Sequence, residues 1–593
     1  MNKMNKVLLS FTCALALAGC SASSSAASSS TTSSGYKAGT YTGVGHGHNG
    51  EVKVDVTFTD SAIESIKISE SSETPTLSDP ATEKLPELIV KNQTTNVDGI
   101  SGATMTSNAI KNAVLDAVDQ AGGDSKAFES KEAEKETLAT DDIDTDVLVI
   151  GGGASGLLAA QTAAKAGAKT TLVEKLDTLG GTMVVSAGLL LTVDSKTTTD
   201  VDDSLDRMMT FFKTQNETSD VQPDYDYASA IFEQTGSTVD YLKSDLGLEG
   251  TTLDMGGYVG TQFTIGYELV KNMVDQCEKN GVTILTGTKA DSLTVTDGAV
   301  TGAKVTNDSG SYTINAKKVI VAAGGANWSE DLKSSQPALK TVDLNEKSCI
   351  GNSGDGMKML EEVGADMSDN LYIKSSQHDF AQVFGTNWSN TPSTSMTMLV
   401  DADGKRFTNE AQAADTMVNE AMLKHASSGY WNIIDKNNAV GFDADFLKKI
   451  EEQSASDNKT VAVYADTIEE LAEKMGVNAD NLKASFDTYQ AACESGTDSE
   501  FGKSSEYLKA YSTDGGYYAV YRRCGSWGTI GGAITDETMH VLDASGNAIA
   551  NVFAVGETAT PKLFGDYYFG GYSLGSYTTE GIIAANTAVS EMN

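Results

Sequence analysis

The fold is decided by residues 146–156, which read DVLVIGGGASG. Four apolar residues lead into three glycines at Gly-x-Gly-x-x-Gly spacing, and an apolar helical pattern continues from there to Gly167. A second apolar run covers residues 170–173 and ends at Glu174. This order predicts a buried strand, a glycine turn, a helix and a second strand, which together open a Rossmann-like α/β domain.

The spacing of the glycines suits a dinucleotide. Gly151 permits a tight turn, Gly153 lets the backbone approach a pyrophosphate, and Gly156 packs the helix against the sheet. The phosphates are expected at the helix N-terminus, and the carboxylate of Glu174 is expected to accept a hydrogen bond from a ribose hydroxyl. The motif alone fits NAD and FAD equally, so the rest of the chain has to decide between them.

Composition and charge exclude several classes of protein. The chain has 593 residues, enough for about three or four domains, and a formal net charge of −39. The acidic balance argues against nucleic acid and against an anionic membrane surface as partners. Besides Cys13 and Cys20, four scattered cysteines form no Cys-x-x-Cys pair and the five histidines form no cluster, so neither haem, an iron–sulfur cluster nor a metal site is indicated.

The N-terminus has the pattern of an export signal. Two lysines precede an apolar run at residues 7–18, which is too short to span a bilayer. Residues 17–20, Leu-Ala-Gly-Cys, resemble the bacterial lipobox. The resemblance implies removal of the signal segment within residues 1–20 by cleavage before Cys20, lipidation of that thiol, and a lipoprotein held at the outer face of the cell membrane through Cys20 only. A plain signal peptide with a chance cysteine is the alternative, and residues 21–34 form a Ser-rich tether.

A small α+β domain is predicted over residues 35–122. An amphipathic pattern predicts a helix over residues 109–118, with Ser107 as its N-cap. Three further stretches predict strands: residues 39–44, 51–59 and 62–70. A Lys- and Glu-rich segment, residues 123–142, reads as the linker to the next domain.

One motif in this small domain is similar to a motif of a known family. Residues 98–104, DGISGAT, resemble the attachment motif of FMN-binding domains, as in the sodium-pumping quinone reductase. Residues 36–43 and 73–75 are also similar to that domain. The resemblance implies that a flavin transferase esterifies FMN phosphate to Thr104 and not to the nearby Thr106. A Ser/Gly loop that only caps a helix is the alternative.

The remainder of the chain, residues 143–593, resembles the FAD-binding domain of the soluble fumarate reductase and flavocytochrome c family. That family includes urocanate reductase and relatives of 3-ketosteroid dehydrogenase. The resemblance rests on glycine-rich strand ends and decides for FAD, held without a covalent bond because no His follows Gly180-Gly181. The residues it assigns to FAD are Gly151, Gly153, Ala154, Ser155, Gly156, Glu174, Lys175, Gly180, Gly181, Thr182, Ala187, Gly188, Ala323, Gly324, Gly325, Asp355, Gly556, Glu557, Ser573 and Leu574.

The family resemblance also implies the domain order. A capping domain, residues 374–521, is inserted between two parts of the FAD-binding domain, residues 143–373 and 522–593. The expected fold class is therefore α/β with α+β modules: a Rossmann-like FAD-binding domain with an inserted capping domain, preceded by the small FMN-binding domain.

A second motif implies the reaction. In the family, reduced FAD gives hydride to one carbon of an activated double bond and an Arg of the capping domain protonates the other. That Arg lies in Gly-x-Arg-Phe-x-Asn-Glu, and residues 404–410, GKRFTNE, match it, so Arg406 is the candidate acid. Because Arg has a reference pKa above ~12, the role requires a closed site and a proton relay. A structural Arg paired with Glu410 is the alternative.

Several departures from the dicarboxylate reductases stand around this motif. The dicarboxylate reductases carry His-Pro-Thr at the start of the capping domain, and of these three residues only the His, His378, is kept here. They also carry an acidic and a basic residue of a proton relay, and residues 388–395 contain neither. Residues 527–532, WGTIGG, lack a His pair, and residues 567–571, YYFGG, place Tyr where an Arg clamps a carboxylate. Replacement of Arg by Tyr exchanges a carboxylate fork for an aromatic face and a hydroxyl. Fumarate is therefore not the expected substrate.

The expected acceptor is an enone such as a 3-oxo steroid, or an aryl-acrylate. Tyr568 would donate a hydrogen bond to its carbonyl oxygen, and His378 would assist. Electrons would come from a membrane flavin or quinol system through FMN to FAD, as in anaerobic respiration. The alternatives are a fumarate- or urocanate-type reductase, a ketosteroid-type dehydrogenase, an electron-transfer lipoprotein without a small-molecule substrate, and, for the Tyr cluster, simple core packing.

Overall fold

The computed structural model describes residues 35–134, 137–217, 219, 221–330, 334, 344–369, 371–377, 395–411, 429–438, 444–454, 462–512, 516–565 and 568–592. The predicted signal and tether, with Cys20, fall outside these residues, as do His378 and Tyr567. Within the described ranges, no helix combines the length and apolar character needed to cross a membrane.

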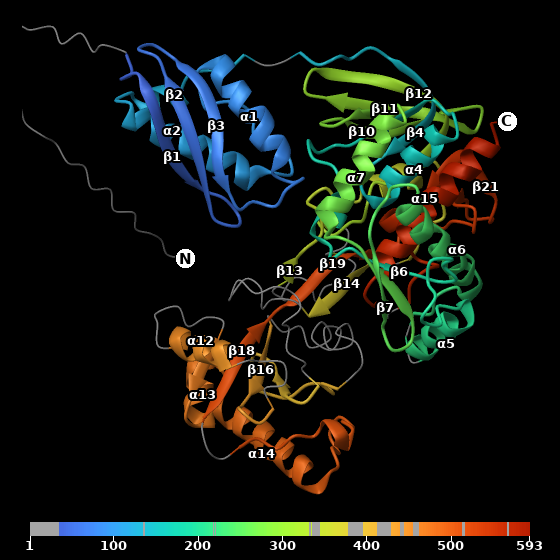
Figure 1. Cartoon of the computed structure of the whole chain (residues 1–593). Helices are drawn as coiled ribbons and strands as arrows, with labels where there is room; N and C mark the ends of the chain where they lie inside the picture. Colours follow the sequence, from blue (N-terminus) through green and yellow to red (C-terminus); the bar gives the residue numbers. More distant parts are fainter. Residues whose placement is uncertain are drawn as a thin grey trace, which may run out of the picture.

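The small domain is a three-stranded antiparallel sheet covered by helices (Figure 1). Its elements are β1 (Gly39–His46), β2 (Glu51–Phe58), β3 (Ile63–Ser71), α1 (Asp79–Asn92), α2 (Thr104–Gln120) and α3 (Ser125–Glu129). Alternate residues of β2, namely Val52, Val54 and Val56, are fully buried in one cluster with Ile110 and Val114 of α2. The predicted strands and the predicted helix are confirmed, because alternation in the strands and helical spacing in α2 present matching apolar faces.

The start of α2 differs from the prediction. The helix begins at Thr104, its N-cap is Ala103, and no side chain caps it. Ser107 lies inside the first turn, where its hydroxyl accepts a hydrogen bond from the Ile100 N–H at 3.0 Å and donates to the Ala103 carbonyl at 2.9 Å. Ser107 therefore closes the loop that precedes the helix instead of capping the helix.

The linker segment is partly built into its neighbours. Phe128 of α3 is buried in the core of the small domain, and the Thr94 hydroxyl donates to the Phe128 carbonyl at 2.7 Å. Further on, the Leu138 N–H donates to the Ser309 hydroxyl of the next domain at 2.6 Å. Both ends of the segment are thus fixed by hydrogen bonds.

The large domain contains an eight-stranded sheet of order β10-β11-β12-β4-β5-β9, in which β21 pairs with β12 and β20 with β21. The central strands are parallel. Its strands are β4 (Ile143–Ile150), β5 (Thr170–Val173), β9 (Thr283–Leu285), β10 (Lys289–Thr296), β11 (Ala299–Asn307), β12 (Gly310–Val321), β20 (His540–Leu542) and β21 (Ala548–Ala554). The predicted unit of strand, glycine turn, helix and strand is present as β4, α4 and β5.

Helices cover the sheet and enclose the main core. Residues of α4, α7, α6 and α15 pack with Val147, Val149 and Leu172 in one apolar cluster, while α9 packs with Leu148 and Ile150 in another. These helices are α4 (Ala154–Lys165), α5 (Leu205–Asn216), α6 (Tyr225–Ser244), α7 (Gly266–Lys279), α9 (Asp355–Glu362) and α15 (Tyr572–Ser590). A separate sheet of order β6-β8-β7 comprises Leu189–Leu191, Val259–Gln262 and Thr251–Asp254.

The capping domain has its own four-stranded sheet of order β15-β16-β18-β17 and is drawn in orange at the bottom of Figure 1. Its elements are β15 (Met398–Val400), β16 (Tyr430–Ile434), β17 (Ala462–Ala465), β18 (Tyr517–Arg522), α12 (Ala444–Ser454), α13 (Ile468–Met475) and α14 (Ala479–Ser495). A further sheet of order β13-β19-β14 joins this domain to the rest, from β13 (Leu344–Glu346), β14 (Tyr372–Gln377) and β19 (Cys524–Ile530). The strands that enter and leave the capping domain, β14 and β19, therefore pair with each other.

Candidate functional site

The glycine turn after β4 has the geometry that a phosphate cradle requires. Gly151 has φ +110°, and a Cβ there would lie 2.2 Å from the Ala322 carbonyl oxygen. A Cβ on Gly156 would lie 1.9 Å from the Gly151 carbonyl oxygen, so these two glycines permit close packing. Gly153, the N-cap of α4, instead faces open space, with nothing within 4 Å of an added Cβ. A pyrophosphate can therefore approach the N-terminus of α4 at Gly153.

Glu174 fixes the turn to the end of β5. Its carboxylate accepts hydrogen bonds from the Gly152 N–H at 2.8 Å and from the Leu176 N–H at 2.9 Å. Burial raises the pKa of this carboxyl, against the lowering effect of those hydrogen bonds. Each carboxylate oxygen can accept a second hydrogen bond, so Glu174 remains able to receive a ribose hydroxyl.

A cavity of about 840 Å³ begins at this turn. Most of the residues assigned to FAD line it, among them Gly151, Glu174, Ser573 and Leu574. Four assigned residues do not line it: Gly156, Gly180, Gly325 and Gly556. Each of these four is adjacent in sequence to a lining residue and supports the wall from behind. The open cradle at Gly153 and the length of the lining fit an extended dinucleotide such as FAD.

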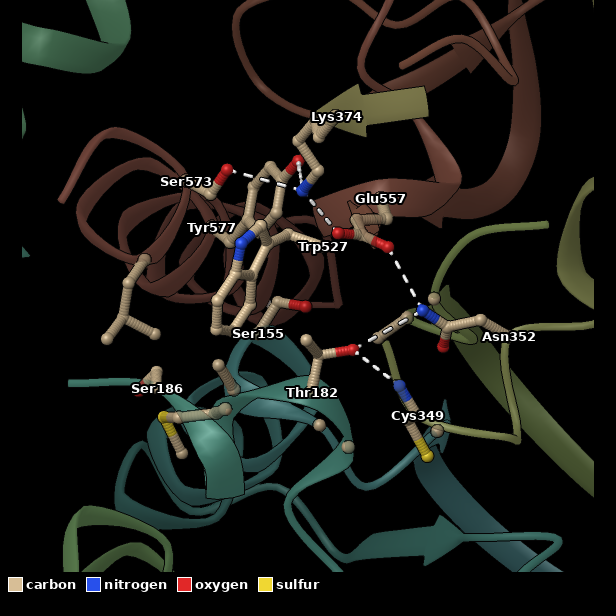
Figure 2. Close-up of a pocket in the computed structure, with 18 of the residues that line it drawn as sticks. Ser155, Thr182, Ser186, Cys349, Asn352, Lys374, Trp527, Glu557, Ser573 and Tyr577 are labelled. Carbon is tan, nitrogen blue, oxygen red and sulfur yellow. Dashed lines mark hydrogen bonds and ion pairs between the residues drawn. The ribbon is translucent and has the colours of Figure 1, made fainter. Parts of the chain in front are cut away.

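A chain of polar contacts runs along one wall of the cavity (Figure 2). The Thr182 hydroxyl accepts from the Cys349 N–H at 3.0 Å and from the Asn352 amide at 3.4 Å. The same Asn352 amide donates to Glu557 at 3.1 Å, and Glu557 forms an ion pair with Lys374. These contacts bring together residues from four separate segments of the chain. Sequence reasoning identified Thr182 and Glu557 but missed Asn352 and Lys374.

Lys374 is the most informative of the missed residues. Its ammonium group donates to the Glu557 carboxylate, to the Tyr577 hydroxyl at 3.0 Å and to the Ser573 hydroxyl at 3.3 Å. Burial lowers the pKa of Lys374 and raises that of Glu557, while each charge favours the ionised form of the other. The only sequence signal was a Lys in the otherwise apolar start of β14, which predicts an exposed strand position as readily as a buried ion pair.

Gly528 makes room for this ion pair. A Cβ on Gly528 would lie 1.9 Å from Glu557 Oε1 and 2.5 Å from Lys374 Cε. Gly528 belongs to the WGTIGG stretch that departs from the dicarboxylate reductases. The absence of a side chain there is what lets β19 pass directly behind the two charged groups.

The far end of the cavity is aromatic. Phe211, Tyr258, Trp527, Tyr568 and Phe569 all line it. The rings of Phe211 and Tyr258 lie 5.0 Å apart, and those of Tyr258 and Phe569 lie 4.7 Å apart. Burial raises the pKa of Tyr568 to about 12, so its phenol stays protonated and can donate a hydrogen bond at neutral pH. Trp527 and Tyr568, which were singled out from the sequence, line the cavity, and so do Phe211 and Tyr258, which were not singled out.

The cations of the cavity wall are distributed unevenly. Among the described lining residues the cations are Lys175, Lys289 and Lys374. Lys175 and Lys289 both lie near the Asp355 carboxylate, at 2.6 and 3.7 Å. Lys374 lies near an aromatic lining residue, with its Nζ 5.9 Å from the centre of the Tyr568 ring. No Arg of the described lining residues takes the place of a carboxylate clamp.

Arg406 lies in the capping domain and does not line this cavity. Its guanidinium donates to both carboxylate oxygens of Glu410, at 2.8 and 2.9 Å, and to Asp498 at 2.7 Å. Burial acts to lower the pKa of Arg406, but the hydrogen bonds and charges of Glu410 and Asp498 outweigh burial and raise it. The pairing with Glu410, which the sequence left open as an alternative, is therefore present.

One nitrogen of Arg406 is left over. Nη1 is buried and makes no hydrogen bond within the described residues, and its nearest carboxylate, Glu500, lies 4.0 Å away. The Lys503 ammonium donates to Glu410 at 3.2 Å and to the Tyr489 hydroxyl at 3.0 Å. Asp498 and Lys503 were missed from sequence, because their contacts with this cluster span about ninety residues of chain.

In the small domain, the two threonines of the attachment motif differ in environment. Thr104 is exposed at the first position of α2. Thr106 is buried, and its hydroxyl donates to the Glu73 carboxylate at 2.5 Å. Glu73 also accepts from the Asn49 N–H at 2.7 Å. A phosphate ester can form at Thr104 without unfolding the domain, whereas at Thr106 it would break a buried hydrogen bond.

The fold and the site define a flavin-dependent oxidoreductase with two flavin domains. The FAD binding domain family matches residues 146–576, and the chain belongs to that family. The FMN-binding domain model matches residues 47–119. The predicted fold class and the two predicted cofactors are confirmed.

Relatives show the reaction class of the family. A urocanate reductase from Eggerthella lenta is 27% identical over 93% of this chain and 92% of its own length. An NADH:acrylate oxidoreductase from Vibrio harveyi is 27% identical over 93% of this chain, which spans 61% of that protein. The open conformation of a flavocytochrome c3 fumarate reductase matches 76% of this chain and 78% of its own, with 26% identity and a TM-score of 0.58. The chain is a flavin-dependent oxidoreductase of the family that reduces carbon–carbon double bonds.

Proposed function

We propose that the protein is an extracytoplasmic reductase that adds hydride from FAD to the activated double bond of an acceptor that is not a dicarboxylate. An aryl-acrylate or an enone such as a 3-oxo steroid fits best. The observation that carries this is the aromatic lining of the cavity, to which Phe211, Tyr258 and Trp527 contribute, together with the state of Lys374, the lining cation beside Tyr568, which is already paired with Glu557. A dicarboxylate would bury two carboxylates beside a cation that Glu557 already neutralises, which is strongly unfavourable.

The cavity residues would bind and orient a flat acceptor. Aromatic rings favour stacked or edge-on contact with another ring, so Phe211 and Trp527 select a planar group. The neutral phenol of Tyr568 would donate a hydrogen bond to the acceptor carbonyl and draw electron density from its β-carbon. FAD, when bound, supplies the hydride. The relatives named for acrylate and urocanate act on monocarboxylates, which would bury one carboxylate fewer than a dicarboxylate in this cavity.

Arg406 would supply the proton. Nη1 is the one nitrogen of its guanidinium that makes no hydrogen bond within the described residues, so it is available to a substrate once the capping domain closes over the cavity. Glu410 and Asp498 hold the other nitrogens and form the start of a proton relay. Because the carboxylates raise the pKa of Arg406, the transfer requires that protonation of the substrate carbon and reprotonation of Arg406 be tightly coupled.

Electrons would reach FAD through FMN esterified to Thr104 by a flavin transferase. The exposure of Thr104 and the buried hydrogen bond of Thr106 support this choice of residue. The electrons would come from a membrane flavin or quinol system. Anchoring through lipidated Cys20 would keep the protein beside that donor, and mass spectrometry of the mature N-terminal peptide tests it: an unmodified Cys20 would refute anchoring.

The test of the function is anaerobic oxidation of reduced viologen by the flavinylated protein, with fumarate, urocanate, cinnamates and 3-oxo-4-ene steroids as acceptors. Activity confined to aromatic or steroidal acceptors supports the proposal. Tyr568→Phe, which removes only the hydroxyl, should then lower the rate with carbonyl acceptors. Dominant fumarate activity would refute the acceptor class. Desaturation of a saturated ketone, with no reduction of any enone, would indicate a ketosteroid-type dehydrogenase, and inactivity with every acceptor would favour the electron-transfer lipoprotein.

A further inference from the structure

Two loops of the small domain contact the FAD-binding domain. The Ser101 N–H donates to the Asp177 carboxylate at 2.7 Å, and the Asp177 N–H donates back to the Ser101 carbonyl at 3.2 Å. The Thr76 hydroxyl donates to the Tyr267 carbonyl at the start of α7 at 2.9 Å. Figure 1 shows the small domain beside α7. These three hydrogen bonds, together with the packing described next, are called the docking contact.

Gly102 brings the two domains into close packing. It has φ +94°, and a Cβ there would lie 2.1 Å from Thr178 Oγ1 and 3.2 Å from Thr178 Cβ. Thr178 is buried by this approach, with 4% of its surface exposed. The glycine that precedes Ala103 and Thr104 in the attachment motif therefore also serves the contact between domains.

The docking contact uses the two loops of the small domain that surround Thr104. Ser101 and Gly102 belong to the attachment motif itself. Thr76 follows the loop of Glu73, whose carboxylate is tied to Thr106 beside the attachment residue. The edge that bears Thr104 is thus the edge that faces the FAD-binding domain.

On the opposite side, the docking contact lies directly behind the wall of the FAD cavity. Asp177 and Thr178 stand between Lys175 and Gly181, which both line the cavity. Tyr267 follows Gly266, where a Cβ would lie 1.8 Å from the carbonyl oxygen of cavity-lining Met183. One short segment of chain, residues 175–188, therefore separates the small domain from the FAD site.

We propose that the docking contact is the electron-transfer interface between the two flavins, and that Asp177 and Thr178 are the residues of the FAD-binding domain that position it. The inference rests on the proposed attachment of FMN to Thr104. Thr104 is three positions from Ser101, a span of at most roughly 11 Å, and Asp177 is two positions from Lys175, a span of at most roughly 7 Å. Such short spans keep a flavin on Thr104 next to the cavity wall.

The transfer balances without any further reagent. Two electrons leave reduced FMN and reduce FAD, and the accompanying protons exchange with solvent, so that one flavin is oxidised as the other is reduced. The acceptor then takes a hydride and a proton and gains one C–H bond at each carbon of its former double bond. In the experiment below, photoreduction supplies the electrons that first reduce the flavins.

The experiment compares the flavinylated wild-type protein with a double variant, Asp177→Ala with Thr178→Arg. The arginine side chain would occupy the space of Gly102, and the loss of the carboxylate removes the acceptor of the Ser101 N–H. The rate of electron exchange between FMN and FAD after partial photoreduction is expected to fall roughly tenfold or more, as the docked fraction falls. FMN content and FAD content should stay unchanged. Asp275→Ala, at an exposed acid of α7 paired with Lys271, is the matched control.

Hydrogen exchange in flavin-free protein gives a second readout that does not depend on turnover. The backbone N–H groups of Ser101 and Asp177 should be protected in the wild type and exchange faster in the double variant. If the double variant loses FAD, Asp177→Ala alone and Thr76→Val, on the other side of the contact, replace it. Wild-type rates of exchange between flavins in all variants would refute the docking inference. An absence of transfer in the wild type itself would refute the relay through FMN.

Discussion

The Lys374 ammonium and the Glu557 carboxylate form a buried ion pair in the wall of the cavity, although 183 positions separate them in the chain. Their side chains are 2% and 8% exposed. Neither charge would be tolerated at that depth without the other, because desolvation of a lone buried charge costs several kcal/mol. The pair therefore couples the strand that enters the capping domain, β14, to the glycine turn that follows β21.

Lys374→Met should destabilise the FAD-binding domain by about 3–5 kcal/mol, because Glu557 is left buried without its partner. The double variant Lys374→Met with Glu557→Gln should recover most of that loss, since it leaves no unpaired charge. Denaturant unfolding, monitored through the release of FAD, measures the stability of both variants. Equal stability of the single and the double variant would show that the charges are not coupled.

Glu580 should make the protein less stable as the pH rises. This fully buried carboxyl accepts from the Gly556 N–H at 2.7 Å, and burial raises its pKa from 4.5 to about 8. Between those two values the folded state holds a proton that the unfolded state has lost, so stability falls with increasing pH. Glu580→Gln keeps the acceptor for Gly556 and removes the titration.

The variant Glu580→Gln should match the wild type near pH 5 and exceed it at pH 8, by up to about 4 kcal/mol. Thermal unfolding at the two pH values measures this. Glu591→Gln, at the partly exposed carboxylate that pairs with Lys318 and His540, is the control and should not reproduce the gain at high pH. A Glu580→Gln curve parallel to the wild-type curve would contradict the assignment of the buried proton.

Arg406→Lys should lower turnover by roughly 10²–10⁴-fold while both flavins stay bound, because it removes the planar guanidinium and with it Nη1. Lysine retains the positive charge facing Glu410 and Asp498, so the capping domain should remain folded. Lys405→Ala, at the exposed neighbouring residue, is the control and should leave turnover unchanged. Full activity in Arg406→Lys would exclude the guanidinium as the proton donor.

Thr104→Ala should abolish FMN attachment, and Thr106→Val should preserve it. The Thr106 change removes a donor to the buried Glu73 carboxylate, so a loss of about 1–3 kcal/mol in the stability of the small domain is expected. Intact mass spectrometry of protein made together with a flavin transferase reports both variants. An FMN adduct that persists in Thr104→Ala and disappears in Thr106→Val would reverse the assignment.

Local sequence patterns predicted the strands, turns and helices around the glycine motif because the interactions that form these elements are local. The strand, turn and helix at Gly151, Gly153 and Gly156 depend on backbone geometry within one short segment, and sequence spacing records it directly. The interest in Trp527 and Tyr568 came from their positions relative to the substrate-binding motifs of the family, and both residues line the cavity. Ser107 was wrongly predicted to be the N-cap of the helix. Its hydroxyl instead hydrogen-bonds the preceding loop, and only the path of that loop decides between these two roles.

The missed residues depend on contacts that are distant in sequence. Lys374 meets Glu557, and Asp498 meets Arg406, only after whole domains have folded. The sequence around Lys374, in an apolar strand, and around Asp498, after a helix, does not indicate which residues they pair with. Phe211 lines the cavity because α5 packs beside Tyr258 and Phe569, an arrangement that periodicity in α5 alone does not contain.

The strands that carry the capping domain also build the cavity. Lys374 lies on β14, Trp527 and Gly528 lie on β19, and a single residue, Arg523, separates β19 from β18 of the capping sheet. Any rotation of the capping domain would bend these paired strands and would shift the ammonium group and the indole ring together. The strands that support the capping domain would thus couple its orientation to the occupancy of the cavity.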